Sequence, residues 1–297
     1  MLFANRSAAE KRAALRAGLE SGKLLQAPGA YAPLVALEIE ARGFEAVYVS
    51  GAVLAADLGL PDIGLTTLTE VARRAHQIAR VTDLPAIVDL DTGFGEPMNA
   101  ARSLRTMEEQ GIAGCHIEDQ VNPKRCGHLD NKAVVETAAM VRRVRAAAKA
   151  KRDPNFVLIA RSDARAVEGL DKAIDRMKAY VDAGADMIFP EALEGPAEFE
   201  AVRNAIDVPL LANMTEFGKS PLLTGAALES LGFNLAIYPV TTMRLAMHAV
   251  TAGLAELHAK GTQAGLLDRM QHRRDLYRLL RYEDYNAFDR GIFDFEV

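Results

Sequence analysis

Short apolar runs alternate with longer amphipathic stretches along almost the whole chain. Eight runs are rich in apolar residues, among them EAVYVSG (45–51), PAIVDLD (85–91) and NFVLIARSD (155–163). Between the runs, apolar residues recur at helical spacing, for example over 67–81 and 170–184. The runs lack a clean apolar–polar alternation, which is typical of parallel strands that are buried on both faces. The pattern therefore predicts about eight strand–helix units.

Eight such units without a linker between them favour an α/β fold of the closed (β/α)8 barrel type, which typically needs ~250 residues. We expect the barrel over about 23–261, preceded by a helix over about Ser7–Ser21 and followed by a helical extension over 263–297. The chain would then be a single domain, 1–297. A doubly wound open sheet is the alternative, but no complete G-x-G-x-x-G turn follows the first strand.

Composition and charge exclude several classes of protein. Apolar residues make up 49% of the chain, charged residues 25%, and the formal net charge is −5, so the sequence supplies no field for a nucleic-acid backbone. No run of about 18 apolar residues predicts a membrane span. The two cysteines, Cys115 and Cys126, are too few for a disulfide framework. We expect a cytoplasmic protein that binds neither nucleic acids nor membranes.

Polar and charged residues stand where the predicted strands end, and in this barrel class the active site lies at those carboxyl ends. Strand ends are solvated and collect charge anyway, which could explain any one residue but less readily the whole set. The set comprises Ser50, Gly51, Asp89, Asp91, Glu118, Asp119, Arg161, Asp163, Glu191 and Asn213, with Arg244 just inside the following helix.

Asp89 and Asp91 form the most informative pair. Residues two apart on a strand share a face, and two carboxylates held close together must be neutralised by a proton or a cation. Oxygen ligands with room for water suit Mg²⁺, and Glu118 on the next strand could complete the set. An N-terminal helix cap would explain Asp91 alone. Zinc is disfavoured because the six histidines show no H-x-x-H or H-x-x-x-H spacing.

A second cluster, Asn122–His128, follows the fourth predicted strand. Its thiol, Cys126, is flanked by Lys124, Arg125 and His128, and a positive field lowers the pKa of a thiol and makes it a usable proton donor or nucleophile. The alternative is an incidental cysteine in a basic loop. Cys115 lies inside a predicted strand, where a free cysteine is normally inert.

These motifs together resemble the isocitrate lyase / phosphoenolpyruvate mutase superfamily. The resemblance covers about residues 5–290 and rests on three motifs: the string Lys124-Arg-Cys-Gly-His128, the pattern Asp89-x-Asp91-x-Gly93-x-Gly95, and Ser50-Gly51 followed by Leu58–Asp62. Two further stretches, Phe189–Ala192 and Asn213–Gly218, are similar to the branch of the superfamily that cleaves 2-methylisocitrate.

The resemblance implies a carbon–carbon lyase that depends on Mg²⁺, or Mn²⁺, and splits this tricarboxylic acid into pyruvate and succinate, as in propionate catabolism by the methylcitrate cycle. It also implies a homo-oligomer, a dimer or tetramer, whose terminal helix is exchanged between subunits. The implied metal residues are Asp89, Asp91, Glu118 and, through water, Asp62; the catalytic ones are Cys126 as acid, Arg161, and Tyr48 as candidate base, for which core packing is the alternative. The implied substrate-binding residues are Ser50, Gly51, Ala52, Gly127, His128, Arg161, Glu191, Asn213, Arg244 and Arg273.

Other functions remain open from the sequence. A related enzyme of the superfamily could act on isocitrate, 2,3-dimethylmalate or oxaloacetate, or carry out phosphonopyruvate chemistry, although the last two reactions generally proceed without the acid that Cys126 would supply. A barrel that only binds ligands is the third possibility. The intact set of Asp89, Asp91, Cys126 and Arg161 argues against it.

Overall fold

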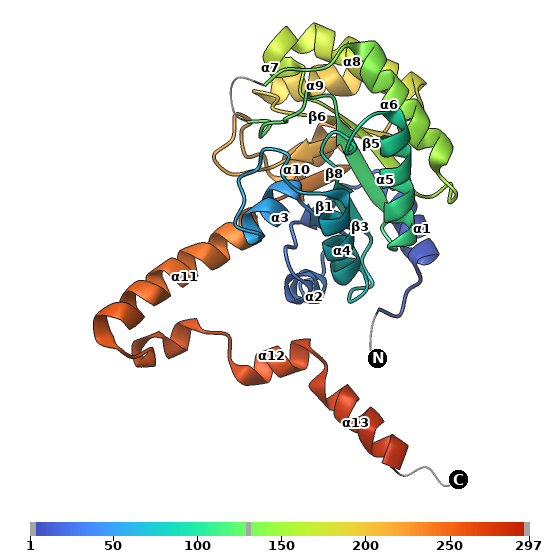
Figure 1. The fold of residues 1–297 in the computed structure, drawn as a ribbon. Coiled ribbons are helices and arrows are strands. Elements are labelled where there is room, and N and C mark those ends of the chain that lie inside the picture. The colour runs from blue at the N-terminus through green and yellow to red at the C-terminus, as the bar shows by residue number, and fades with distance from the viewer. Residues whose placement is uncertain (1–3, 129–131, 294–297) are drawn as a thin grey trace.

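A ring of short parallel strands forms the centre of the molecule (Figure 1). The computed structural model describes residues 4–128 and 132–293, so residues 1–3, 129–131 and 294–297 of the expected domain lie outside the described residues. The strands are β1 (Leu25–Pro28), β2 (Val47–Val49), β3 (Ala86–Asp89), β4 (Gly114–Glu118), β5 (Val157–Ser162), β6 (Met187–Pro190), β7 (Leu211–Asn213) and β8 (Leu235–Tyr238).

The strands pair in the order β2-β3-β4-β5-β6 and β1-β8-β7, and all printed pairings are parallel. Parallel bridges Gly29–Tyr48 and Ile188–Leu210 join β1 to β2 and β6 to β7. These two bridges close the sheets into one ring, which confirms the predicted barrel and excludes the open sheet.

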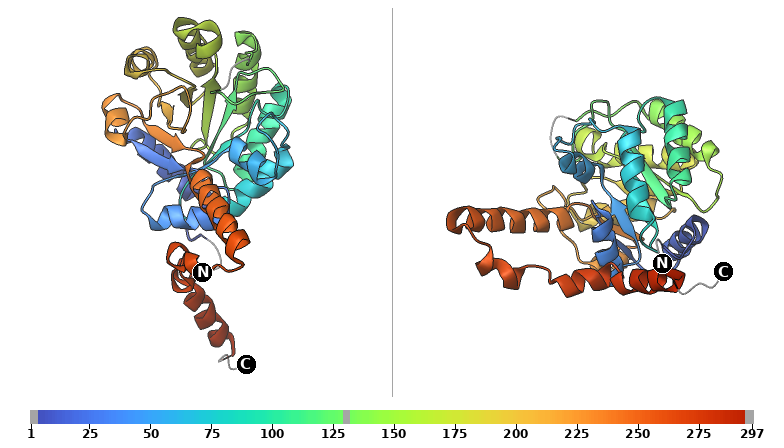
Figure 2. Two further views of the ribbon diagram at one scale, coloured as in Figure 1. Left: turned by 90° about the vertical axis from the view of Figure 1, so that its left-hand side faces the viewer. Right: turned by 60° about the horizontal axis from the view of Figure 1, so that its bottom comes forward.

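Helices surround this ring (Figure 2). In the described residues they are α1 (Ala8–Glu20), α2 (Pro33–Ala41), α3 (Gly51–Asp57), α4 (Leu68–Ala79), α5 (Pro97–Glu109), α6 (Thr137–Ala150), α7 (Arg165–Glu168), α8 (Leu170–Asp182), α9 (Pro196–Ala205), α10 (Gly225–Ser230), α11 (Thr241–Lys260), the 3₁₀ helix η1 (Ala264–Arg269), α12 (Arg273–Leu279) and α13 (Tyr282–Phe293). Local sequence sets several of their starts: Ser7 and Thr67 form capping boxes with Glu10 and Glu70.

Alternate strand residues face inward, because side chains of a strand alternate between its two faces. Ile87, Ile159 and Phe189 belong to the core inside the barrel, whereas their neighbours Val88, Leu158 and Ile188 pack in the layer between strands and helices. The same alternation places the polar residues at the carboxyl ends of the strands on the inner face, and we call these inward-facing positions the inward phase of each strand. It leads from Tyr48 to Ser50, from Ile87 to Asp89, from His116 to Glu118, from Ile159 to Arg161, from Phe189 to Glu191 and from Leu211 to Asn213.

Helix α1, where a helix was predicted over Ser7–Ser21, closes the amino end of the barrel. Its Leu15 and Leu19 join the inner core. Lys11 Nζ donates to the carbonyl of Ala79 (2.8 Å), and Arg12 Nε donates to the carbonyl of Ile112 (2.9 Å). With this end sealed, a small molecule reaches the barrel from the carboxyl ends of the strands.

The chain from α11 onward leaves the barrel and forms an arm, which we define as residues 241–293 (Figures 1 and 2). Helix α11 has 20 residues and none of them is buried. The eighth helix therefore does not cover its own barrel, unlike the eighth unit of a regular (β/α)8 fold. No helix within the described ranges is long and apolar enough to cross a bilayer.

Candidate active site

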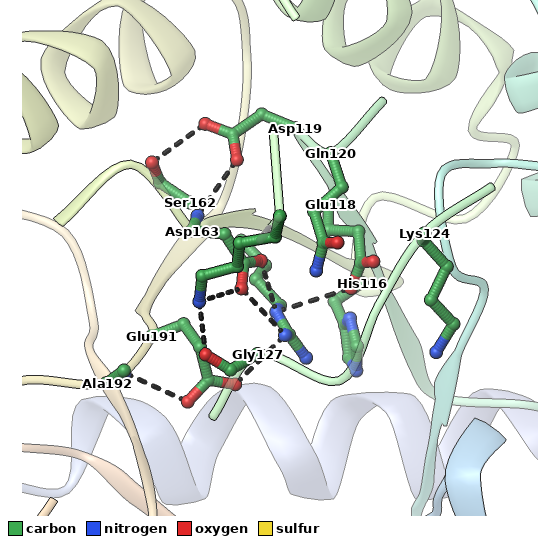
Figure 3. Close-up of polar contacts among 12 residues, drawn as sticks. His116, Glu118, Asp119, Gln120, Lys124, Gly127, Ser162, Asp163, Glu191 and Ala192 are labelled. Atoms are coloured by element: carbon green, nitrogen blue, oxygen red, sulfur yellow. Dashed lines mark hydrogen bonds and ion pairs between the residues drawn. The ribbon is translucent and has the colours of Figure 1, made fainter. Parts of the chain in front are cut away.

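The residues predicted from the strand ends lie together at the open end of the barrel; Figure 3 shows Glu118, Asp163 and Glu191 among them. Asp89, Glu118 and Arg161 are in the last positions of β3, β4 and β5 or next to them, and Glu191 directly follows β6. All four side chains are buried, as are Ser50 after β2 and Asp91 after β3. The structure thus brings together groups that are up to 141 residues apart in the sequence.

Asp89 and Asp91 converge over Gly51, at the start of α3. The Gly51 N–H donates to Asp89 Oδ2 (3.2 Å). A Cβ on Gly51 would lie 2.9 Å from Asp89 Oδ2 and 3.3 Å from Asp91 Oδ1, so the glycine makes room for both carboxylates. Strand alternation does not cause the convergence, contrary to the prediction, because β3 ends at Asp89 and Asp91 has a left-handed φ of 48°. Such backbone strain in a non-glycine residue often marks functional sites.

Charges around this pair are incompletely balanced. Burial and the charge of Asp89 raise the pKa of Asp91 to about 6, although Lys124 Nζ lies 2.8 Å from Asp91 Oδ1. Burial also raises the pKa of Glu118 well above its ordinary value, against the opposing charge of Arg161. Glu118 Oε1 is buried without a hydrogen-bond partner.

This donor set fits a hard divalent cation such as Mg²⁺, which prefers oxygen ligands and keeps several waters. Two converging carboxylates and one buried, unpartnered carboxyl oxygen are available to it. No group of three or more potential ligands in the described part of the chain is gathered tightly enough to hold a metal alone. Asp62, a predicted outer ligand, pairs with Lys124 Nζ instead.

Arg161 is held by three carboxylates. Its Nε lies 2.9 Å from Asp163 Oδ2 and 3.3 Å from Glu118 Oε2, and its Nη2 lies 3.1 Å from Glu191 Oε2. The guanidinium also lies over the ring of Phe189, with Cζ 5.0 Å from its centroid. Burial alone would raise the pKa of Glu191, but Arg161 and His128 bring it below its usual range. Arg161 is therefore a charged group in a fixed orientation.

The loop that carries Cys126 lies directly on this arginine cluster. A Cβ on Gly127 would lie 2.6 Å from Glu191 Cγ and 2.8 Å from Asp163 Oδ1, and closer still to Arg161 Nη2. His128 Nε2 lies 2.9 Å from Glu191 Oε1, and its Nδ1 accepts from the Lys219 N–H (3.0 Å). At the other end of the loop, Lys124 reaches Asp91. Cys126 thus lies between two residues that contact the site.

The electrostatic environment of Cys126 differs from the prediction. The thiol is half-buried, and burial raises its pKa, whereas the flanking cations were expected to lower it. Those cations are engaged elsewhere: Lys124 pairs with Asp62 and Asp91, and Arg125 Nη1 turns back to the carbonyls of Pro123 and Lys124. At neutral pH Cys126 is a protonated thiol, which suits a proton donor and not a thiolate nucleophile.

Tyr48 lies inside the barrel, below the rim. Its hydroxyl is 2.7 Å from His116 Nε2, and the two rings stack with their centroids 5.9 Å apart. Burial and the charge of Asp89 raise the pKa of Tyr48 well above its ordinary value, and burial lowers the pKa of His116 to about 4. Both groups are uncharged near pH 7 in the protein alone, and the role of Tyr48 as a general base stays a prediction.

The remaining predicted residues differ in how close they lie to the Arg161–Glu191 cluster. Asn213 Nδ2 lies 3.3 Å from both oxygens of Glu191, and Ala52 lies in the first turn of α3. Arg244 is at the edge of the rim, where its Cζ lies 4.9 Å from the ring centroid of exposed Phe217. Arg273 is exposed on α12, which lies beside α2, so the single chain does not bring it to the rim.

Sequence reasoning missed two residues that touch this cluster. His116 Nε2 lies 2.7 Å from the Tyr48 hydroxyl, and His116 Nδ1 lies 3.6 Å from Asp89 Oδ1. Lys132 Nζ lies 3.0 Å from Asp163 Oδ1. The inward phase of β4 could have indicated His116, two positions before Glu118, but no sequence signal indicated that the lysine turns inward.

Comparisons of the sequence place the chain among known enzymes. The phosphoenolpyruvate phosphomutase family profile matches residues 15–258. "Probable 2-methylisocitrate lyase 1" of Corynebacterium glutamicum is 64% identical over 286 residues, which is 96% of this chain and 94% of that protein. The 2-methylisocitrate lyase of Escherichia coli is 46% identical over 274 residues, covering 92% of this chain and 93% of that one.

Solved structures agree with this placement. A 2,3-dimethylmalate lyase of the PEP mutase/isocitrate lyase superfamily superposes with a TM-score of 0.88 at 32% identity, covering 97% of this chain and 96% of that one. A phosphonopyruvate hydrolase in complex with oxalate and Mg²⁺ gives a TM-score of 0.86 at 29% identity, with 94% and 98% covered. From the fold, the rim and these relatives, the chain belongs to the PEP mutase/isocitrate lyase superfamily, and the relatives that it matches over nearly its whole length include 2-methylisocitrate lyases.

Proposed function

We propose that this protein is a lyase that cleaves 2-methylisocitrate into pyruvate and succinate and depends on Mg²⁺ or Mn²⁺. The observation that carries the proposal is that the Cys126–His128 string lies on the Arg161–Glu191 cluster, beside the converging carboxylates Asp89 and Asp91. Relatives with 46–64% identity over nearly the whole chain bear the name of this activity.

The reaction requires that a proton leave the substrate hydroxyl and that the bond between the hydroxyl carbon and its neighbour break. The hydroxyl carbon becomes the ketone of pyruvate, and the bonding electrons remain on a carbon of the succinate fragment, which then takes up a proton. A divalent cation held by Asp89 and Asp91, with Glu118 nearby, would lower the pKa of the hydroxyl and stabilise the oxygen charge. Asp62 would contribute through water.

Arg161 binds a carboxylate of the succinate half. Its guanidinium is held from three sides by Asp163, Glu118 and Glu191, so little side-chain freedom is lost when a substrate carboxylate arrives. Glu191 and Asn213 form the wall next to it, together with Gly127 and His128. Ser50, Gly51 and Ala52 lie at the opposite side, where they would hold the carboxylate of the pyruvate half.

Cys126 supplies the proton that the succinate carbon takes up. Its thiol is protonated at neutral pH because burial raises its pKa, so the group arrives at the reaction in the donor form. The S–H bond breaks as the new C–H bond forms, and the thiolate is reprotonated before the next turnover. Tyr48 remains the candidate for the residue that accepts the hydroxyl proton, with its own hydroxyl 2.7 Å from His116 Nε2.

The arm supports the further proposal that the protein is a homo-oligomer with exchanged terminal helices. Large apolar side chains along the arm are exposed, which a monomer in water does not favour. They include Leu245, Met247, Val250, Leu254, Leu257, Leu267, Met270, Tyr277, Phe288 and Ile292. A second copy would cover them, and the barrel (23–261) and extension (263–297) would then form one domain across the exchange. Arg273 would reach a rim only by this route, and Arg244 would take an outer carboxylate.

The deciding experiment identifies products by proton NMR from four substrates: 2-methylisocitrate, isocitrate, 2,3-dimethylmalate and oxaloacetate. Each is incubated with the purified protein and either MgCl2, MnCl2 or EDTA. We expect pyruvate and succinate from 2-methylisocitrate, loss of turnover in EDTA, and loss of turnover but retained substrate binding in Cys126→Ser. Faster cleavage of another acid would overturn the substrate assignment, and no cleavage of any would favour a binding protein.

The oligomer is tested by light scattering after size-exclusion chromatography. We expect the wild-type mass to be that of a dimer or tetramer. Leu254→Glu places a charge on the apolar face of α11 and should shift the mass toward the monomer. Glu109→Gln, at the end of α5 with an exposed side chain, is the control for a surface charge change. A monomeric wild-type protein would refute helix exchange.

A further inference from the structure

Lys132 is a buried cation next to the active site that the reaction chemistry above does not use. Its side chain is 2% exposed. Lysine ammonium groups are seldom buried unless they are paired, and this one has two partners. Nζ lies 3.0 Å from Asp163 Oδ1, and it donates to the carbonyl oxygen of Gly127.

The backbone next to Lys132 is fixed at the end of β4. Val121 N–H donates to the carbonyl of Ala133 (2.8 Å), and Val135 N–H donates to the carbonyl of Asp119 (2.8 Å). An antiparallel bridge between Gln120 and Val134 lies between these bonds. Lys132 therefore extends from a fixed base, and its ammonium group reaches across to the other side of the same loop.

The two partners of Lys132 belong to different parts of the site. Asp163 orients Arg161 through two hydrogen bonds, from Nε (2.9 Å) and from Nη2 (3.1 Å). Gly127 is adjacent in sequence to Cys126 and lies in close contact with Arg161 and Glu191. One ammonium group thus connects the backbone beside the thiol to the carboxylate that orients the arginine.

We propose that Lys132 is a positioning residue. Its ammonium group links the Gly127 carbonyl to Asp163 and thereby holds Cys126 at a fixed position relative to Arg161. The expected change in kcat rests on the proposed function, whereas the expected change in the position of Cys126 does not. Without the ammonium group, Asp163 and Arg161 still pair with each other. The Gly127 carbonyl, however, loses the hydrogen bond that links it through Lys132 to Asp163. Substrate carboxylate binding then persists, and the thiol loses its defined position.

The main variant is Lys132→Met, which keeps most of the side-chain length and removes the ammonium group. Lys151→Met is a matched control. Lys151 Nζ pairs with Asp186 (2.7 Å), and Asp186 also pairs with Arg16 (2.7 Å), so that this lysine shares a carboxylate with an arginine in the same way. The control pair lies at the amino end of the barrel, near α1, where it cannot affect Cys126.

Two readouts separate a positioning role from general stabilisation. For turnover of 2-methylisocitrate, displacement by about 1 Å costs up to ~10²-fold in rate, so we expect kcat of Lys132→Met to fall by roughly that factor with KM changed by less than about threefold. For the thiol, we expect iodoacetamide to alkylate Cys126 several-fold faster than in the wild type, measured by peptide mass spectrometry, while Cys115 stays unmodified. Lys151→Met should match the wild type in both.

The alkylation readout keeps the proposal testable in every case. If the wild type cleaves none of the four acids, the proposed function fails, but the rate of Cys126 alkylation still tests the role of Lys132. If Lys132→Met does not fold, Lys132→Gln, which retains an amide donor without the charge, must show the faster alkylation. An unchanged alkylation rate in the folded variant, or an equal increase in Lys151→Met, overturns the proposal.

Discussion

Replacing Gly127 by alanine tests whether the cysteine loop lies on the arginine cluster during turnover. The added Cβ would lie 2.6 Å from Glu191 Cγ and 2.8 Å from Asp163 Oδ1. Arg161 Nη2 would lie closer still. Non-bonded heavy atoms prefer separations of roughly 3.5–4.0 Å, so the backbone at position 127 has to retreat by at least about 0.9 Å. Neither neighbour can give way instead, because Glu191 and Asp163 are both buried and paired with Arg161.

The retreat displaces Cys126 relative to the bound substrate. A misplacement near 1 Å costs on the order of 10²-fold in rate, so we expect kcat/KM of Gly127→Ala to fall by about that factor. Forcing a methyl group into a packed region costs about 1–3 kcal/mol when nothing moves. Since the loop can move away from the barrel, we expect a smaller loss of stability, with a Tm decrease of no more than about 2–4 °C.

The assay compares Gly127→Ala with Gly195→Ala, the matched control. Gly195 precedes α9, has an extended φ of −173°, and has no heavy atom within 4 Å of an added Cβ. Pyruvate release with 2-methylisocitrate gives kcat/KM, and scanning calorimetry gives Tm. Wild-type kcat/KM in Gly127→Ala would show that the loop does not occupy this position in the reacting complex. A Tm decrease as large in Gly195→Ala would show that the loss of stability does not come from the contact of position 127 with Glu191 and Asp163.

Three further predictions concern neighbouring groups. Asp89→Asn removes one of the converging carboxylates, and we expect the Mn²⁺ affinity measured by titration calorimetry to fall by at least about tenfold; an unchanged affinity would remove Asp89 from the metal site. Gly218→Ala places a Cβ 2.7 Å from His128 Nδ1, so we expect a several-fold increase in KM with an unchanged circular dichroism spectrum, and an unchanged KM would refute the contact. Because burial raises the pKa of Cys126, its thiolate fraction at any pH is smaller than that of a free thiol, whose pKa is about 8.5. The alkylation rate should accordingly increase at a higher pH than for glutathione. An increase at a lower pH than for glutathione would instead support the lowered thiol pKa that the flanking cations predict.

The regular part of the fold follows from local sequence patterns. Apolar runs of four to eight residues separated by helical periodicity specify parallel strands with their connecting helices, and eight such units close the barrel. The rim residues follow from the same regularity. Because Asp89, Glu118, Arg161 and Glu191 continue the inward phase of their strands, reading the strand ends was sufficient to find them.

The electrostatics of the rim depend on contacts that sequence proximity does not reveal. Lys124 stands two residues from Cys126, yet its charge is taken up by Asp62 and Asp91. The sequence therefore indicated a lowered pKa for the thiol where the structure gives a raised one. Asp91 also lies next to Asp89 for a reason that is not visible in the pattern, namely a left-handed turn after the strand has ended.

The arm could be predicted as helical but not where it would lie. An amphipathic pattern specifies that a helix has an apolar face, and it does not specify which surface covers that face. In α11 large apolar residues are exposed, and none of the helix is buried. A helix packed on its own barrel and a helix that extends away from it have the same pattern in sequence, and only the geometry after Thr241 distinguishes them.

The balance of buried charge at the rim connects the metal to the substrate. Six carboxyl groups at or next to the strand ends are buried, namely Asp89, Asp91, Glu118, Asp119, Asp163 and Glu191. The buried cations among the described rim residues are Lys124, Lys132 and Arg161, so the acids outnumber them two to one. Burial raises the pKa values of Asp91, Glu118 and Asp119, because neighbouring buried carboxyl groups must be neutralised by protons or by a cation. A divalent cation beside Asp89 would favour the ionised forms of Asp91 and Glu118 and would attract the substrate hydroxyl and its carboxylates, so we expect the cation to bind before the substrate.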